Sequence, residues 1–125
     1  MYPTDRRYSK DHEWIAVDGD AALVGITDFA QKELGDIVYV ELPQNGQRVK
    51  TGDVLGTIES VKAVSEILAP VAGTVVDANQ ELDGKPEAVN EDPHGSGWYC
   101  KLLLADAAEV ETLLDAEAYQ KLIEE

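Results

Sequence analysis

Lys62 stands alone in a stretch of the sequence where its chemistry could be used. It is the only lysine between Lys50 and Lys85, and it falls in the short link between two expected strands. A lysine has a long flexible stem, and its amine is a nucleophile once deprotonated, so a lysine at a hairpin tip can tether an acyl group. Acylation would replace a strongly hydrated ammonium group by a neutral amide. The segment predicts either a modified, swinging lysine or a plain solubilising one.

The residues on either side of Lys62 favour access by a modifying enzyme. Val61 and Ala63 are small and apolar, so they leave the approach to the lysine unobstructed. A hairpin tip projects its side chain away from the sheet, where another protein can reach it. Glu59 and Glu66 lie at the expected hairpin base, where their carboxylates could position basic groups of that enzyme.

Short strands separated by turn signals must position this segment. The runs of apolar and β-branched residues predict strands at 13–17, 22–26, 36–42, 54–59, 66–69, 74–78 and 99–104. The link 60–65 must then be a tight connection, and the polar stretch 79–97, rich in glycine and proline, predicts a long irregular loop. Segment 36–42 is apolar on both faces, which predicts a central strand. Similar glycine-led strands on both sides of Lys62 favour a flattened all-β barrel or sandwich.

Helices are expected at three places. Asp28 opens a capping-box pattern, which predicts a short helix that ends at Gly35. Asp106 opens a second capping box, and Asp115 can cap a further helix. The two C-terminal helices, within about residues 105–125, are too short to persist alone, so they should pack against the sheet core.

Length and composition bound the class of protein. The 125 residues suffice for one domain with a core that needs no disulfide, and the lone cysteine, Cys100, fits a reducing compartment. No apolar run approaches the roughly 20 residues that span a bilayer, and residues 1–10 lack the apolar centre of a secretory signal. We therefore expect a single domain over residues 1–125, located in the cytoplasm, with a monomer as the default.

The charge balance excludes two classes of partner. The chain has 25 acidic and 10 basic residues, a formal net charge of −15. Binding to nucleic acid or to an anionic membrane needs clustered Lys and Arg, so neither partner is expected. The acidic surface could instead speed docking on basic patches of partner proteins, or it could serve solubility alone.

No set of residues predicts independent catalysis. His12 and His94 lack the spacing of metal ligands, and His12 is expected to pack beside Trp14. Cys100 lies in an apolar strand without a helix N-terminus or strongly basic setting, so it reads as a small core residue. A nucleophile, a base and an orienting group are not found together.

The string Gly56-Thr-Ile-Glu-Ser-Val-Lys62-Ala resembles the lipoylation signature of the glycine cleavage H-protein family. Val61 before the lysine distinguishes it from lipoyl domains of 2-oxo-acid dehydrogenases, which typically have aspartate there, and from biotin carriers, which have methionine. The resemblance continues in order from about Tyr8 through His12-Glu13-Trp14, Gly25-Ile-Thr-Asp28, Leu34-Gly35-Asp36, Val40-Glu-Leu-Pro43, Gly84-Lys-Pro86, Val89-Asn90, Gly97-Trp98 and Leu113-Leu-Asp-Ala-Glu-Ala-Tyr119.

This resemblance implies a fold and a cofactor. The fold is mainly β, a lipoyl/biotinyl-type hammerhead (a flattened barrel-sandwich) with a short internal helix and two C-terminal helices. Lys62 is then the attachment point of a covalent lipoate, as N6-lipoyllysine. The recognition hairpin around it would comprise Glu59, Ser60, Val61 and Ala63.

The resemblance also implies a role and partners. The chain would be a non-catalytic shuttle that carries an aminomethyl group from the pyridoxal-phosphate glycine decarboxylase to the tetrahydrofolate-dependent aminomethyltransferase, and then meets dihydrolipoamide dehydrogenase. A lipoate ligase or octanoyl transferase would load it. Three alternatives stay open: a lipoate relay that donates lipoyl groups to other carriers, a small hydrolase that uses Glu13 and a histidine, and an interaction module that is never modified.

Two carboxylates are implied as cleft residues. In the family the loaded arm rests in a surface cleft, where a carboxylate would satisfy its amine. Glu13, within His-Glu-Trp, is the better match, and Glu66 is the second. Many relatives have aspartate at the position of Glu66, so its longer side chain departs from the family pattern. An alternative reading is that a glutamate near a strand start is simply solvated.

Overall fold

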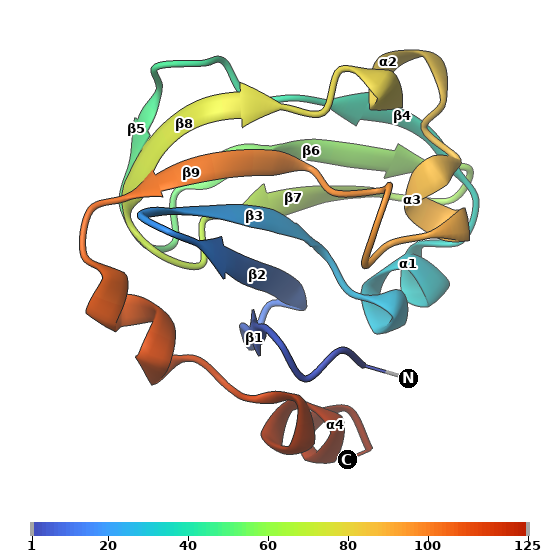
Figure 1. Cartoon of the computed structure of the whole chain (residues 1–125). Helices are drawn as coiled ribbons and strands as arrows, with labels where there is room; N and C mark the ends of the chain where they lie inside the picture. The colour runs from blue at the N-terminus through green and yellow to red at the C-terminus, as the bar shows by residue number, and fades with distance from the viewer. Residues whose placement is uncertain (1, 125) are drawn as a thin grey trace.

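The larger of two antiparallel sheets contains six strands. The computed structural model describes residues 2–124. The sheet has the order β1-β2-β3-β9-β8-β5 (Figure 1), formed by β1 (Arg7–Tyr8), β2 (Glu13–Asp18), β3 (Ala21–Ile26), β9 (Cys100–Leu104), β8 (Gly73–Ala78) and β5 (Arg48–Val49). Every pairing in it is antiparallel. All seven predicted strands are present, with ends within two residues of those expected, and the short strands β1 and β5 were not predicted.

The smaller sheet carries the lysine hairpin. Its order is β4-β6-β7, formed by β4 (Ile37–Glu41), β6 (Val54–Ser60) and β7 (Val64–Leu68). The predicted central position of the first of these strands is wrong, because β4 lies at an edge. Its alternation is also broken, since a β-bulge between Ile37 and Tyr39 leaves both Val38 and Tyr39 exposed. Apolar residues on both faces therefore reflect an exposed bulge and not two buried faces.

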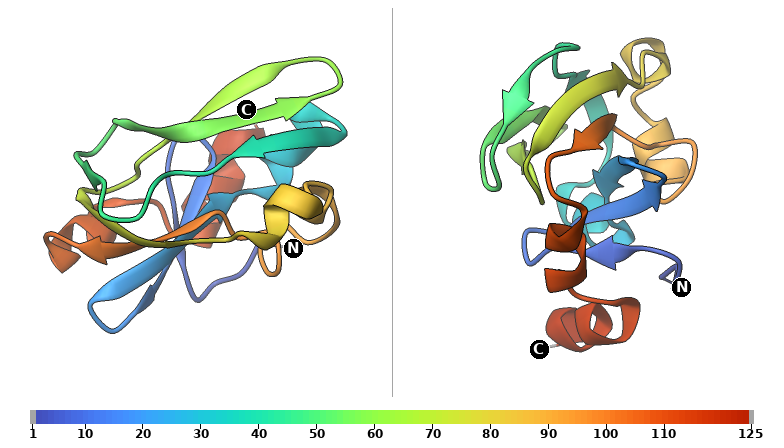
Figure 2. Two further views of the ribbon diagram at one scale, coloured as in Figure 1. Left: turned by 90° about the horizontal axis from the view of Figure 1, so that it is seen from above. Right: turned by 60° about the vertical axis from the view of Figure 1, so that its left-hand side comes forward.

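The main core lies between the two sheets, which Figure 2 shows from two further directions. Ile15, Val24, Ile58 and Leu102 are each at most 1% exposed. Cys100 is fully buried among them, which confirms its prediction as a core residue. These two antiparallel sheets confirm the predicted mainly β class.

Helix α1 (Asp28–Leu34) brings the chain from the large sheet to the small one. Its N-cap is Thr27, whose Oγ1 accepts a hydrogen bond from Ala30 N, so the predicted cap at Asp28 is wrong by one residue. Asp28 lies instead in the first turn, where its carboxylate accepts a hydrogen bond from the Gln31 side chain. The helix ends at Gly35 as predicted, with φ of 81°.

The stretch 79–97 is more regular than predicted. It contains two short helices, α2 (Glu81–Gly84) and α3 (Ala88–Glu91), and the buried side chains of Leu82 and Val89 anchor them in the core. The sequence did not predict these helices, because this stretch is rich in turn-forming residues and a helix of one turn is too short to show a periodic apolar pattern.

The C-terminal segment forms two helical pieces, of which only the second is an α-helix. A 3₁₀-helix, η1 (Ala107–Thr112), starts at its predicted cap, Asp106. Helix α4 (Ala116–Glu124) packs its apolar stripe on Tyr8 and Trp14, in a second cluster below the large sheet. Within residues 2–124, no helix is both long and apolar enough to cross a membrane.

His12 does not pack where the sequence suggested. Its ring lies against Phe29, with centroids 4.7 Å apart, and its Nδ1 is 2.8 Å from the Tyr119 hydroxyl. Its φ is +69°, and its carbonyl accepts a hydrogen bond from Thr27 N. The turn before β2 therefore aims the ring at α1 and α4 and not at Trp14.

Candidate functional site

Ser60 shapes the turn that presents Lys62. Strands β6 and β7 run antiparallel as far as the pair Glu59 and Val64, and residues 61–63 form the tip. The buried Ser60 Oγ accepts hydrogen bonds from Lys62 N at 3.2 Å and Ala63 N at 3.0 Å. Ser60 N also donates to Ala63 O at 2.8 Å. A turn with its backbone amides satisfied in this way holds the lysine backbone in one place.

The tip is also tied to the element beside it. Val61 N donates a hydrogen bond to Asp36 O at 3.0 Å, which fixes the tip against the residues that follow α1. Lys62 is exposed, and among the described residues no carboxylate lies within ion-pair distance of its ammonium group. The backbone of this lysine is fixed, while its amine stays free for chemistry.

The stem of Lys62 lies over Gly35. A Cβ built on Gly35 would lie 3.4 Å from Lys62 Cε, which is ordinary van der Waals contact with the stem. The backbone of Gly35, with φ of 81° and ψ of −156°, is a conformation that residues with a side chain avoid. The sequence identified Gly35 as a helix stop, but its contact with Lys62 depends on a tertiary approach that no local pattern signals.

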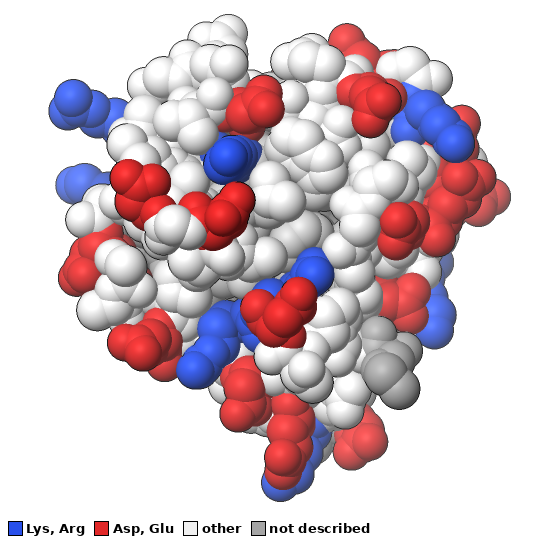
Figure 3. Space-filling view, viewed as in Figure 1, with Lys and Arg blue, Asp and Glu red and all other residues white. Residues whose placement is uncertain are grey.

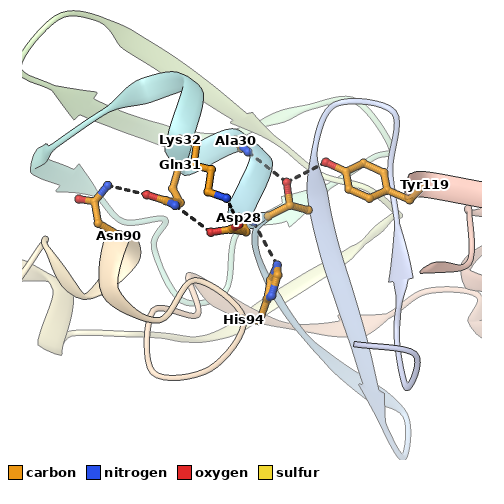
Figure 4. Close-up of polar contacts among 8 residues, drawn as sticks. Asp28, Ala30, Gln31, Lys32, Asn90, His94 and Tyr119 are labelled. Atoms are coloured by element: carbon orange, nitrogen blue, oxygen red, sulfur yellow. Dashed lines mark hydrogen bonds and ion pairs between the residues drawn. The ribbon is translucent and has the colours of Figure 1, made fainter. Parts of the chain in front are cut away.

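Asn90, in α3, holds the backbone around Gly35. Its Nδ2 donates to Gly35 O at 2.8 Å and to Gln31 Oε1 at 2.9 Å, while its Oδ1 accepts from Ile37 N at 2.9 Å. These bonds connect the end of α1 and the start of β4 through one side chain. Figure 4 shows the bond from Asn90 to Gln31. Asn90 appeared in the sequence only as a family match, because the partners of its amide lie more than fifty positions away.

A second polar group fixes the other end of α1. The Thr27 hydroxyl lies 2.7 Å from that of Tyr119, which extends from α4 (at the right in Figure 4). Asp28 N donates to His94 Nε2 at 3.1 Å, so that ring nitrogen is unprotonated; burial lowers the pKa of His94 and favours this neutral form. Asp28 also forms an ion pair with Lys32 at 3.0 Å. Together with Asn90 these contacts hold both ends of the helix on which the lysine tip rests.

Glu13 is buried, so it is not the solvated glutamate of the alternative reading. It is 2% exposed; its Oε1 accepts from Ser9 Oγ at 2.6 Å and its Oε2 from Leu68 N at 3.2 Å. Burial raises the pKa of Glu13 to about 7, although the two hydrogen bonds act in the opposite direction. The carboxyl therefore bridges the start of β2 to the free edge of β7.

Glu66 takes no part in this contact. It is exposed and pairs in register with Thr57, two residues before the amide that Glu13 accepts from. The structure gives no hydrogen bond between the two carboxylates among its described contacts. Glu59, opposite Val64, is exposed beside the tip, as are Val61 and Ala63.

Known proteins resemble this chain in sequence and in fold. The glycine cleavage H-protein family profile matches residues 6–125. The glycine cleavage system H protein of Carboxydothermus hydrogenoformans is 53% identical over 125 residues, which is 100% of this chain and 96% of that protein. The chain belongs to the glycine cleavage H-protein family. The H protein of Bacteroides fragilis is 49% identical over 122 residues, 98% of this chain and 97% of the relative.

A solved structure agrees with the fold. The crystal structure of a glycine cleavage system H protein from Mycobacterium marinum superposes with a TM-score of 0.90 at 37% identity, and the match covers 99% of this chain and 100% of that one. The predicted flattened barrel-sandwich is thereby confirmed. H proteins are the lipoyl carriers of the glycine cleavage system, so this chain is a carrier component and not a catalyst.

Proposed function

We propose that Lys62 is the residue that carries lipoate, through an amide bond to its Nζ, and that the chain presents this group in turn to three enzymes. These are glycine decarboxylase, the tetrahydrofolate-dependent aminomethyltransferase and dihydrolipoamide dehydrogenase. When bound, lipoate supplies a disulfide that accepts an aminomethyl group and becomes a dithiol to be reoxidised. The chain itself contributes location and a high effective concentration of that group.

One observation carries this proposal: in an H-protein family member, the signature lysine stands exposed on a turn whose backbone is fixed. Ser60 Oγ and Asp36 O hold the tip, and Gly35 leaves room under the stem of Lys62. The ammonium group is free of ion pairs with described carboxylates, so acylation breaks no contact. These features fit an amide-linked arm that must pivot.

The loading enzyme, a lipoate ligase or an octanoyl transferase, would recognise the hairpin around the lysine. Val61 and Ala63 are exposed on either side of Lys62, and Glu59 projects a carboxylate from the neighbouring strand position. Ser60 is buried under the turn, so its part in recognition is to set the shape of the tip.

Glu13 and Glu66 are proposed as residues of the cleft that receives the loaded arm. Support for Glu13 is its inward-facing carboxyl, which sits at the edge of β7 with a pKa of about 7 and can accept or donate a hydrogen bond near neutral pH. Glu66 offers an exposed carboxylate on the same strand. We also propose that the whole chain acts as one lipoyl-carrier domain, a monomer, in the cytoplasm, where the buried Cys100 would stay reduced.

Exchange of labelled bicarbonate into glycine by glycine decarboxylase tests the shuttle. The lipoylated wild type should support exchange, while Lys62→Arg should support none because arginine cannot be acylated in the same way. Variant Lys85→Arg is the matched control, since Lys85 is an exposed lysine far along the chain. Exchange by the Lys62→Arg variant would contradict the proposal. Transfer of lipoyl groups to another carrier domain without any exchange would indicate the relay instead.

A further inference from the structure

Exposed apolar side chains gather around the lysine tip. Of the eight large hydrophobic residues described as exposed, four lie next to it: Val38 at 49%, Tyr39 at 52%, Val61 at 68% and Val64 at 65%. Single exposed hydrophobics are ordinary on a protein surface, but a group beside a reactive residue marks an interaction site. The remaining four are spread over β2, β6, β8 and β9.

The bulge in β4 creates half of this group. Ile37 and Val40 point into the core, and a regular strand between them would expose only alternate residues. The extra residue at the bulge turns both Val38 and Tyr39 outward. Bulges of this kind are common next to functional sites, where they redirect a side chain.

Strand register places these residues in rows on one surface. Tyr39 pairs with Glu59, and Glu59 pairs with Val64, so the three side chains form a row across the sheet. The next row on the same side is Glu41, Thr57 and Glu66. We call the surface formed by Val38, Tyr39, Glu41, Glu59, Val61, Val64 and Glu66 the arm face.

The arm face is negatively charged. Glu41, Glu59 and Glu66 are exposed, and none forms an ion pair with a described lysine or arginine. Lys62 is the cation at the tip of the same hairpin, and acylation removes its charge. The loaded protein therefore presents an apolar centre with three unbalanced carboxylates, in the pattern of an apolar core and polar rim that interfaces use.

We propose that the arm face is the docking surface for glycine decarboxylase, through an apolar collar with a rim of Lys and Arg around the entrance to its active site. This inference rests on the proposed function, because an arm on Lys62 can enter an active site only if the surface at its base meets the entrance. The carboxylates select a basic rim, and Tyr39 and Val64 supply the apolar contact. Other parts of the surface are acidic too, but they lack this apolar group beside the tip.

Binding of the unmodified chain to purified glycine decarboxylase tests the arm face without the arm. Tyr39→Ser and Val64→Ser should each weaken binding about tenfold, as loss of an interface anchor does. The matched control is Val76→Ser, which removes a similarly exposed valine (43%) from β8. It should bind within about twofold of the wild type. Because all three side chains are exposed, the variants should fold, and thermal unfolding measurements test this.

A charge variant gives a second, independent reading. Glu41→Lys should weaken binding and flatten its dependence on salt, whereas Glu124→Lys, the same change at the end of α4, should do neither. With lipoylated protein, Tyr39→Ser should raise KM and leave kcat unchanged. If Tyr39→Ser, Val64→Ser and Glu41→Lys all bound glycine decarboxylase as tightly as the wild type does, the arm face would not be the docking surface. The proposed shuttle function would be unaffected by that result. Failure of the wild type to bind would overturn the decarboxylase partnership and the arm face together.

Discussion

Two charged residues of the candidate site experience opposite environments. Lys62 is exposed, and its surroundings constrain only its backbone and stem, through Ser60, Asp36 and Gly35. Glu13 is 2% exposed, with both carboxyl oxygens occupied by hydrogen bonds. Exposure keeps the lysine amine available to a second protein. Burial raises the pKa of Glu13 to about 7, so that this carboxyl titrates near neutral pH. The exposed amine is open to modification, whereas the buried carboxyl, with both oxygens bonded, links Ser9 to the edge of β7.

Replacing Glu13 by glutamine should change how stability depends on pH. A carboxyl whose folded pKa is raised from 4.5 to about 7 stabilises fully below its unfolded pKa and loses that contribution as pH rises through 7. The neutral amide of Glu13→Gln avoids this loss. Its oxygen can accept from Leu68 N as one carboxyl oxygen does now, and its Nε2 can donate to Ser9 Oγ, which in the wild type donates to the carboxyl. Its free energy of unfolding relative to the wild type should therefore rise by roughly 3 kcal/mol from pH 4 to pH 8.

Urea denaturation at several pH values measures this difference. Glu66→Gln is the control, since an exposed glutamate should give a difference that hardly varies with pH. A Glu13→Gln difference that stays constant across the range would show that Glu13 ionises normally and is not held in a desolvating environment.

At the scale of elements, α1 and β4 form the support of the lysine tip. The helix stop at Gly35 and the strand pattern after it could be predicted from the sequence, because glycine and apolar alternation are local signals. The bulge at Val38 and the bonds from Asn90 could not, since they depend on which strand pairs with β4 and on α3 reaching across from residue 90. The cap shifted to Thr27 because Tyr119 and Ala30 both bond to its hydroxyl.

Substitution of Gly35 should damage both stability and loading. Gly35→Ala forces a side chain into a backbone region reserved for glycine, which costs about 1–3 kcal/mol. Relief of this strain would shift the backbone beside Asp36, whose carbonyl holds the lysine tip through Val61 N. We expect a lower melting temperature and slower lipoylation by a lipoate ligase under conditions where the variant is folded. Thermal unfolding and a time course by mass spectrometry measure the two effects.

Gly84→Ala is the control for this prediction. Gly84 has open space around its Cβ position and no strained φ, so alanine there should leave both measurements close to the wild type. If Gly35→Ala were as stable as Gly84→Ala and were loaded at the same rate, the backbone conformation of Gly35 would matter neither to stability nor to the lysine tip.

At the scale of the whole molecule, acidic groups are distributed over the surface and not confined to one patch. Figure 3 shows Asp and Glu over much of the visible face, with fewer Lys and Arg between them. The net charge of −15 follows from the composition. The arm face, where carboxylates lie beside exposed apolar residues, could not be predicted, because it depends on the register of β4, β6 and β7. Likewise, the residue pattern predicted a β-barrel or sandwich. It did not predict the second apolar cluster, in which Tyr119 of α4 packs with Tyr8 and Trp14.

The overall charge should speed encounter with a basic partner. The second-order rate constant for lipoylated chain and glycine decarboxylase should fall as ionic strength rises toward about 1 M, where the Debye length is only about 3 Å. Stopped-flow kinetics at several salt concentrations measure it, and kcat at saturation should stay constant as the internal control. A rate constant indifferent to salt would leave solubility as the purpose of the charge.

Intact-mass analysis of the protein from its native source, followed by peptide mapping, tests directly whether Lys62 carries lipoate. We predict one lipoyl group per chain, located on the peptide that contains Lys62, and none on Lys50 or Lys85. The same result should follow for recombinant chain supplied with lipoate and a ligase, and Lys62→Arg should remain unmodified. A chain that stays unmodified at Lys62 under both conditions, or that carries lipoate on another lysine, would show that Lys62 is not the lipoyl site.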